Sequence, residues 1–263
     1  MRYTIDPLTI LSFISCSIVS LFILIPLLNM LFYPTWDALK ESCIDQDVRR
    51  AIFLSIYTSG LAAVISFIIG TPFAYLLARK SFVGKRFIEG LIDLPIMIPH
   101  PVIGIAILSI VGKHHWIGQM LHDMGIRIMG SVTGIVIVLT FVGLPFYINT
   151  VKNGFESIPV RLEHVSRSLG ASFTHTFFRI TFPLAWRSIV VGIILCSARA
   201  ISEFGAVIVV AYHPMNAPVL IYERFTAYGL NYSQPVAVLL IIVCLILFIG
   251  LRFFSTHKNN VYD

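Results

Sequence analysis

Charged residues are scarce in this sequence. Asp, Glu, Lys and Arg make up 12% of the 263 residues, whereas a soluble domain usually carries about 25%. That deficit excludes a soluble globular enzyme and a disordered protein. Cysteine is also rare, with four residues in the whole chain, and no two of them have the spacing of metal ligands. A disulfide scaffold and a cysteine metal site are therefore excluded.

A phosphate-binding loop is missing too. The sequence contains no Gly-x-x-x-x-Gly-Lys-Ser/Thr motif, the loop whose backbone N–H groups hold the phosphates of a nucleotide. We therefore predict that the chain does not hydrolyse ATP in this way and that it carries no cofactor of its own.

Hydrophobic residues take the place of the missing charge. They make up 57% of the chain, and the mean hydropathy is +0.87. A bilayer core about 30 Å thick needs about 20 apolar helical residues, and long charge-free runs recur. We predict an all-α integral membrane protein, one domain over residues 1–263 with six spans. The spans cover 8–32, 52–78, 91–112, 131–151, 188–211 and 235–254.

Lys and Arg are distributed unequally between the loops. With alternate loops on alternate sides, one side receives twelve of these residues and the other six, while Arg199 lies inside the fifth span. Cytoplasmic loops carry the excess of positive charge, so both termini are expected in the cytoplasm. This topology accounts for the net charge of +6, and no nucleic-acid partner is predicted.

One loop, residues 152–187, is long for a connector and has a pattern of its own. Its first part is amphipathic, and Gly170 is a natural helix stop. Residues 174–180 are again helix-like, and Pro183 restrains the start of the fifth span. The apolar positions of the first helix are Leu162, Val165 and Leu169. Such a helix suits docking into a groove of a soluble partner, or lying flat at the membrane surface.

Two charges fall within the fifth predicted span. Arg199 and Glu203 are four residues apart, so on a helix they share one face and can neutralise each other. A charge at the bilayer centre costs about 2.5–3.5 kcal/mol on insertion scales. The pair either lines a transport pathway or is a structural ion pair that fixes this helix against its neighbours.

The third predicted span begins irregularly. Asp93 and His100 accompany Pro95, Pro99 and Pro101, and three prolines so close together cannot form a regular helix. Irregular backbone at membrane depth is tolerated only against protein or a cavity. The segment is therefore a candidate for the pathway wall or a kink needed for packing.

Three histidines of an outer loop, His114, His115 and His122, raise the possibility of a metal site. Adjacent histidines rarely converge on one ion, and no carboxylate pattern accompanies these. We predict a solvated loop and no metal site.

The loop 152–187 resembles the EAA loop of the membrane subunits of ABC importers. That pattern is Glu-Ala-Ala, three residues, Gly, nine residues, Ile, any residue, Leu-Pro. Aligned on Gly170, Ile180 and Pro183 match in register, and Glu163 lies one residue before the family's glutamate position. The departures from the pattern are His164, Val165, Ser166 and Phe182.

Further stretches resemble oxyanion permeases, and the similarity covers about residues 50–225. The stretch 199–206 is similar to their A-R-x-x-x-E-F-G-A sequence. The stretches 93–101 and 217–225 resemble the molybdate/tungstate branch in particular. By this resemblance the sequence is identified as a permease subunit of a molybdate/tungstate ABC importer with the type I permease fold.

The resemblance implies a multi-pass protein of the cytoplasmic (inner) membrane. It implies a second copy of this chain, two ATP-binding cassette subunits that hold ATP and Mg²⁺, and an extracytoplasmic molybdate/tungstate-binding protein. ATP-driven closure would move the loop and open the paired membrane domains alternately to the two sides.

The resemblance also assigns expected roles to residues. Expected ATPase-coupling residues are Arg161, Glu163, His164, Val165, Ser166, Arg167, Leu169, Gly170, Ala171, Ser172, Ile180 and Pro183. Candidates for the pathway or gate are Asp93, Pro95, Pro99, His100, Arg199, Ser202 and Glu203. Expected contacts of the binding protein are Glu223 and Arg224, in an outer segment that is long for a connector.

Rival interpretations remain at this stage. A permease for another oxyanion, such as sulfate or phosphate, shares the fold. A stand-alone secondary transporter explains the spans and buried charges but gives no reason for the patterned loop. A membrane-embedded enzyme would need a larger cluster of reactive side chains at membrane depth.

The predicted topology can be tested with reporter fusions. A reporter fused after Asp263 should be active in the cytoplasm, because both termini are expected there. A fusion within the first outer loop, after Lys40, is the matched control and should report the opposite side. An external signal from the Asp263 fusion would overturn the topology.

Overall fold

The computed structural model describes residues 7–112 and 115–256, and these residues form helices joined by short loops. His114 and the terminal Asp263 lie outside the described residues. The helices before the predicted coupling loop are α1 (Pro7–Phe32), α2 (Trp36–Ile44), α3 (Gln46–Arg79), α4 (Lys85–Met97), α5 (His100–Val111), α6 (Trp116–Asp123) and α7 (Val132–Glu156). Those from the loop onward are α8 (Val160–Ser168), α9 (Phe173–Thr176), the π-helical η1 (Phe177–Thr181), α10 (Phe182–Ile201), α11 (Gly205–Val210), α12 (Ala217–Tyr228) and α13 (Leu230–Thr256).

Five stretches of helix in the described part are long and apolar enough to cross a membrane. They lie at Leu8–Phe32, Gln46–Arg79, Val132–Glu156, Phe173–Ile201 and Leu230–Gly250. The pair α4 and α5 passes the same test as one broken span, with a bend of 112° between its halves. With that pair included, the candidate spans are six.

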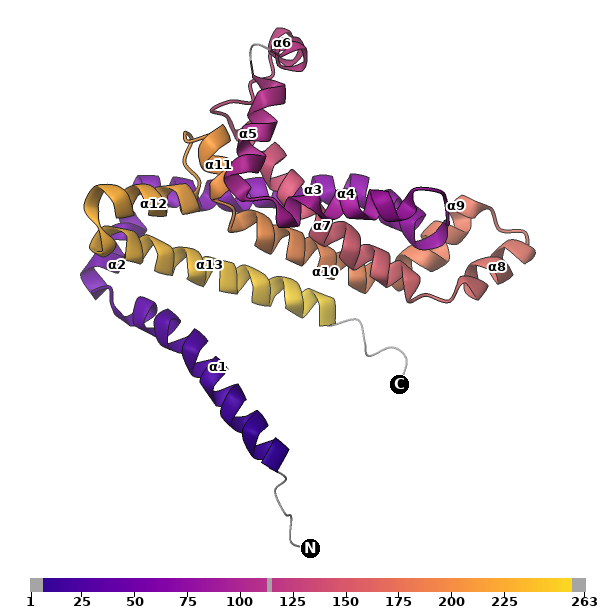
Figure 1. Cartoon of the computed structure of the whole chain (residues 1–263), viewed down its shortest axis with the longest axis horizontal. Helices are drawn as coiled ribbons and strands as arrows, with labels where there is room; N and C mark the ends of the chain where they lie inside the picture. The colour runs from indigo at the N-terminus through magenta and orange to yellow at the C-terminus, as the bar shows by residue number, and fades with distance from the viewer. Residues whose placement is uncertain (1–6, 113–114, 257–263) are drawn as a thin grey trace, which may run out of the picture.

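The bundle is built from α3, α7, α10 and α13, which run along the long axis of the molecule (Figure 1). Small residues let these helices approach closely, as is usual between membrane helices. A side chain on Gly70 would lie 2.7 Å from the ring of Tyr147, and Gly192 meets the other edge of that ring. The Tyr147 hydroxyl is buried and lies 2.6 Å from the Thr71 hydroxyl.

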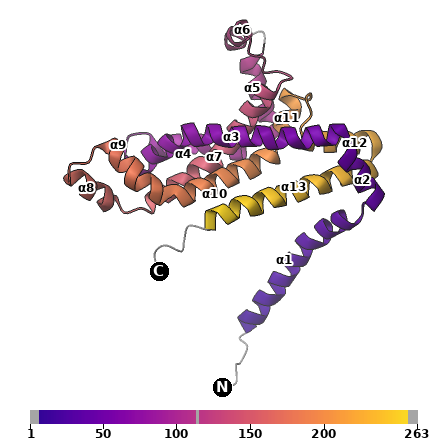
Figure 2. The same cartoon turned by 180° about the vertical axis from the view of Figure 1, so that it is seen from behind.

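Helix α1 lies apart from this bundle and approaches α13 near one end only (Figures 1 and 2). None of its apolar span is buried in the chain. Its hydrophobic side chains are therefore free to meet lipid or another chain.

A separate arm consists of α5, α6 and α11 and projects sideways from the bundle (Figure 2). Helices α5 and α11 pack tightly through Gly104. A Cβ at that position would lie 2.8 Å from both the Ala206 carbonyl oxygen and Cβ of Val209. The backbones of α5 and α11 can approach this closely only because residue 104 has no side chain.

The stretch 188–211, predicted as one helical span, is two helices, and that prediction is wrong. Helix α10 ends at Ile201 and α11 begins at Gly205. The Glu203 carboxylate accepts a hydrogen bond from the backbone N–H of Ala206, which in a continuous helix would bond to a carbonyl. The chain therefore turns at Glu203 and runs into the arm.

The start of this span also differs from the expectation. The second helix of the loop was predicted to end before the membrane, but helix runs without a break from Phe173 to Ile201. A π-helical turn at Phe177–Thr181 ends two residues before Pro183. The wider turn accommodates a proline, which lacks an N–H and whose ring would clash in a regular α-helix.

Substituting Gly104 should destabilise the arm. Gly104→Ala places a methyl group against the α11 backbone, and overpacking of this kind costs about 1–3 kcal/mol. The melting temperature of the detergent-solubilised protein should fall. Gly60→Ala is the matched control, because nothing lies within 4 Å of a Cβ there. An unchanged melting temperature for Gly104→Ala would contradict the close α5–α11 packing.

Candidate coupling loop and transport pathway

The predicted coupling loop forms one end of the molecule, with α8 at its tip (Figure 1). Pro159 precedes the helix, and Gly170 follows its last turn with a φ of +90°, a left-handed conformation that favours glycine. Ser172 then caps α9 by accepting a hydrogen bond from the His175 N–H. The chain thus turns back sharply between two helices.

Most predicted coupling residues lie on the surface of this loop. The exposed ones are Arg161, His164, Val165, Arg167, Leu169, Gly170, Ser172 and Pro183. Ala171 and Ile180 are half-buried. Ser166 is buried, and its hydroxyl lies 3.0 Å from that of Thr176, which ties α8 to α9.

Glu163 points into the molecule, and this differs from the role expected of it. Its side chain contacts three residues on two other elements, and Glu163 is only 8% exposed. Oε1 accepts hydrogen bonds from Nε of Arg79 at 2.8 Å and from the hydroxyl of Thr181 at 3.1 Å. Oε2 accepts one from the Tyr75 hydroxyl at 3.0 Å. Glu163 therefore fastens α8 to α3 and η1.

The partners of Glu163 were missed by sequence analysis. Arg79 ends the second span, and its Nη2 also donates to the carbonyl oxygen of Ile158 at 3.1 Å. Tyr75 packs edge-on against Phe155 and Phe177. The position of Arg79 at a membrane boundary is visible in the sequence, but no sequence pattern links it to a residue 84 positions away.

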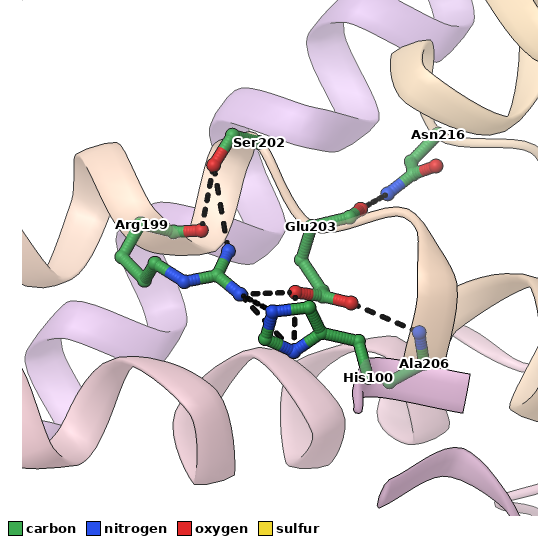
Figure 3. A network of polar contacts seen from close by, with 6 residues as sticks. All are labelled: His100, Arg199, Ser202, Glu203, Ala206 and Asn216. Carbon is green, nitrogen blue, oxygen red and sulfur yellow. Dashed lines mark hydrogen bonds and ion pairs between the residues drawn. The ribbon is translucent and has the colours of Figure 1, made fainter. Parts of the chain in front are cut away.

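The two helix breaks meet at a cluster of His100, Arg199 and Glu203 (Figure 3). Nη2 of Arg199 lies 2.8 Å from Oε2 of Glu203 and 2.7 Å from Nε2 of His100. Nη2 also lies 3.2 Å from Nδ1 of His100. A guanidinium has only donors, so the imidazole accepts through a ring nitrogen. Nδ1 lies 3.5 Å from Oε2 of Glu203. The structure thus brings together three predicted pathway residues: His100 at the start of α5, Arg199 in the last turn of α10, and Glu203 between α10 and α11.

The cluster has a buried side and an accessible side. The side chain of Glu203 is 1% exposed, whereas those of Arg199 and His100 are 20% and 38% exposed. The second carboxylate oxygen, Oε1, accepts the Ala206 N–H at 2.9 Å. A solute that approaches this site meets the guanidinium and the imidazole first, with the carboxylate behind them.

Neighbouring polar groups complete the site. Ser202 is exposed, donates to the Arg199 carbonyl oxygen at 3.0 Å and lies 3.5 Å from Nη1 of Arg199. Asn216 donates through Nδ2 to the Glu203 carbonyl oxygen at 3.4 Å. Both backbone and side chain of Glu203 are therefore held in place (Figure 3).

The other pathway candidates lie elsewhere on the third span. Asp93 on α4 accepts a hydrogen bond of 2.7 Å from Nδ2 of Asn149 on α7 and is half-buried. Pro95 is buried within α4, and Pro99 stands at the bend before α5. Asp93 thus fixes α4 to the bundle and is not part of the His100 cluster.

Arg224, an expected contact of the binding protein, forms an ion pair within the chain. Nη2 of Arg224 on α12 forms an ion pair with Oδ2 of Asp45 at the start of α3. Burial alone would raise the pKa of Asp45, but the bonds from Arg224 and from the N–H groups of Asp47 and Val48 outweigh it. The pKa of this carboxyl is therefore lowered. Glu223 is half-buried.

Residues 7–112 and 115–256 contain no group of three or more His, Cys, Asp or Glu side chains that could hold a metal ion. The described residues instead form a basic coupling loop, the buried Glu163–Arg79 pair, and the cluster of His100, Arg199 and Glu203 at the helix breaks.

Comparison with known proteins identifies the family. Residues 70–257 match the family described as the binding-protein-dependent transport system inner membrane component. The chain belongs to this family. It is 41% identical over 240 residues to the molybdate/tungstate transport system permease protein WtpB of Methanocaldococcus jannaschii, covering 91% of this chain and 94% of the relative. WtpB of Pyrococcus furiosus is 42% identical over 241 residues, covering 91% and 92%.

A solved structure has the same fold. The crystal structure of a bacterial ABC transporter involved in the import of alginate matches with a TM-score of 0.75 at 16% identity, covering 95% of this chain and 96% of that one. The predicted fold class, an all-α membrane protein with the permease fold of an ABC importer, is confirmed. The chain is a multi-pass inner-membrane permease component, not the ATPase of such a system. The orientation of its termini stays a prediction.

Removing the charge of Glu163 should destabilise the chain. Glu163→Gln leaves the buried Arg79 without its counter-ion, and breaking a buried pair costs about 3 kcal/mol. Thermal unfolding in detergent should show a clearly lower melting temperature. Glu156→Gln is the matched control, because that carboxylate pairs with Lys152 at the surface and should matter by less than about 0.5 kcal/mol. Equal melting temperatures for the two variants would contradict the clamp.

Proposed function

We propose that this chain is the permease subunit of an ATP-driven importer of molybdate and tungstate. Relatives at 41–42% identity over nine-tenths of the chain carry that description. The stretches 93–101 and 199–206, which resemble oxyanion permeases, supply His100, Arg199 and Glu203 of the cluster at the helix breaks.

The complex requires further subunits. Membership of a binding-protein-dependent family implies an ATPase partner and a binding protein, and the chain has no phosphate-binding loop of its own. We propose two copies of this chain, two ATPase subunits that hold ATP and Mg²⁺, and an extracytoplasmic molybdate/tungstate-binding protein. The isolated outer face of α1 is available to a second copy or to lipid.

One observation carries the mechanism. A single unbroken helix runs from Phe173 in the coupling loop to Ile201, and Arg199 lies in its last turn. A displacement of the loop therefore moves the guanidinium directly. The clamp of Glu163 with Arg79 passes the same displacement to α3.

The cluster suits a dianion in transit. Arg199 presents N–H donors on the accessible side, which attract a tetrahedral oxyanion. The Glu203 carboxylate behind them already neutralises the guanidinium, so an arriving anion is attracted only weakly. Weak attraction is what conduction requires, because a tightly bound anion would not leave.

Alternating access follows from these parts. ATP-driven closure of the two ATPase subunits would draw the two coupling loops together. Helices α3 and α10 would then tilt with the loops, and the site at the helix breaks would become open to the binding protein. Hydrolysis would return the complex to the state open to the cytoplasm.

The cargo can be tested directly. The purified complex, reconstituted in vesicles with its ATPase subunits and binding protein, should take up labelled molybdate only with ATP. Unlabelled tungstate should compete, and sulfate should compete weakly. Uptake without ATP or binding protein would indicate a secondary transporter. Stronger competition by sulfate than by tungstate would assign a different cargo.

The cluster can be tested in the same assay. Glu203→Gln preserves the shape of the side chain but leaves Arg199 without a counter-ion, so the anion should be held longer. We expect uptake to fall about tenfold, which corresponds to about 1.4 kcal/mol. Ser202→Ala is the control, because its contact with Arg199 is long at 3.5 Å. Unchanged uptake by a well-folded Glu203→Gln complex would show that the pair is dispensable for transport.

A further inference from the structure

A cavity of about 460 Å³ lies between α1, α12 and α13, at the end of the molecule opposite the coupling loop (Figure 1). Its walls are mostly apolar and aromatic, and they include Phe204, which directly follows Glu203 at the helix break. The ring centroids of Phe204 and Tyr222 are 4.8 Å apart. Cavities that bind small molecules have this kind of lining and a volume of roughly 300–1,000 Å³.

Two side-chain amides line the cavity from different helices. Gln234 lies on α13, and its carbonyl oxygen Oε1 is buried without a hydrogen-bond donor. Among the side chains that the structure describes, no other buried oxygen or nitrogen lacks a partner. Asn29 lies on α1 and also lines the cavity. A buried acceptor without a donor is unfavourable, so a ligand that donates a hydrogen bond to Gln234 would be stabilised here.

The lining of the cavity carries no charge. No Asp, Glu, Lys, Arg or His stands among the described residues that line it, and Arg224 on the same helix as Tyr222 is paired with Asp45. A charged ligand would lose its water in this cavity without gaining a counter-ion. The hydrogen-bond donor is therefore expected to belong to an uncharged group.

The cavity lies at the depth of a membrane boundary. Exposed aromatic side chains gather at the helix ends around it: Tyr33 after α1, Trp36 at the start of α2, Tyr228 at the end of α12, and Tyr232 in the first turn of α13. Trp and Tyr are enriched where hydrocarbon meets the lipid headgroups. Because none of the apolar span of α1 is buried in the chain, a lipid can reach the cavity along this helix.

We propose that this cavity binds the uncharged, hydroxyl-bearing headgroup of a membrane glycolipid. A sugar hydroxyl both donates and accepts, so it can pair with Oε1 of Gln234 and with the amide of Asn29. Gln234 is half-buried, and its terminal torsion is soft, so a small rotation presents Oε1 to the headgroup. The C–H face of the sugar ring packs on Tyr222 and Phe225, whose ring faces carry partial negative charge. The acyl chains stay in the bilayer.

Lipid retention tests the site. The full chain, with the subunits that accompany it, is placed in nanodiscs that contain phosphatidylcholine, phosphatidylethanolamine, phosphatidylglycerol and monoglucosyl diacylglycerol in equal amounts. Native mass spectrometry should find that the permease retains the glucolipid in preference to the other three. Gln234→Leu should reduce this retention about tenfold, as expected for the loss of a hydrogen bond to a buried group.

The matched control is Asn231→Leu. Asn231 is an exposed amide in the first turn of α13 and does not line the cavity. Its replacement should leave the retention of the glucolipid at the wild-type value.

The melting temperature gives a second readout. In phosphatidylcholine alone, Gln234→Leu should melt no lower than the wild type, because the acceptor that is removed has no partner. Adding the glucolipid should raise the melting temperature of the wild type and of Asn231→Leu, but not that of Gln234→Leu. A ligand stabilises only the protein that binds it.

Several outcomes would overturn the inference and leave the proposed function intact. Preferential retention of phosphatidylethanolamine or phosphatidylglycerol would show that the cavity takes a charged headgroup. Equal retention of all four lipids, or of none, would show that the cavity does not select a lipid. Free glucose that stabilises the protein as much as the glucolipid would assign the cavity to a soluble sugar. A lower melting temperature of Gln234→Leu in phosphatidylcholine alone would show that Gln234 is paired within the protein.

Discussion

The burial of the Glu203 carboxylate is the constraint on which the centre of this molecule depends. A carboxylate at 1% exposure within a membrane domain is tolerable only if both its oxygens are paired. Arg199 supplies one partner and the backbone N–H of Ala206 the other. Because the second bond requires an interrupted helix, the same interaction that stabilises the charge ends α10 and turns the chain into the arm.

Charge neutralisation also organises the opposite end of the molecule. Glu163 is held by Arg79, and this pair connects the tip of the loop to a helix that spans the bundle. The unbroken helix from Phe173 to Ile201 provides the second connection. Loop and helix break are therefore mechanically continuous, which is what a permease driven by an external ATPase requires. The exposed surface that remains at the tip is basic and apolar.

The sequence predicts correctly those features that depend on neighbouring residues only. Long apolar runs predict spans because the bilayer accepts little else, and the order of helices in the coupling region follows from Gly170 and the helical spacing around it. Sequence analysis failed where distant residues decide the outcome. Glu163 was expected among the ATPase-coupling residues, but its side chain faces inward and pairs with Arg79. No sequence pattern near Glu163 indicates that Arg79, 84 residues away, is its partner.

The sequence by itself determined that this chain is a helical membrane protein, roughly where its spans lie, and which family its coupling loop resembles. Hydropathy and motif spacing are properties of neighbouring residues, so they can be read without a fold. Only the tertiary structure decided that 188–211 divides at Glu203, that His100 joins Arg199, and that α8 shows a basic face. The contact of His100 with Arg199 joins residues 99 positions apart, and no local pattern predicts it. Such pairings arise because buried charges must find partners wherever the packed helices bring them.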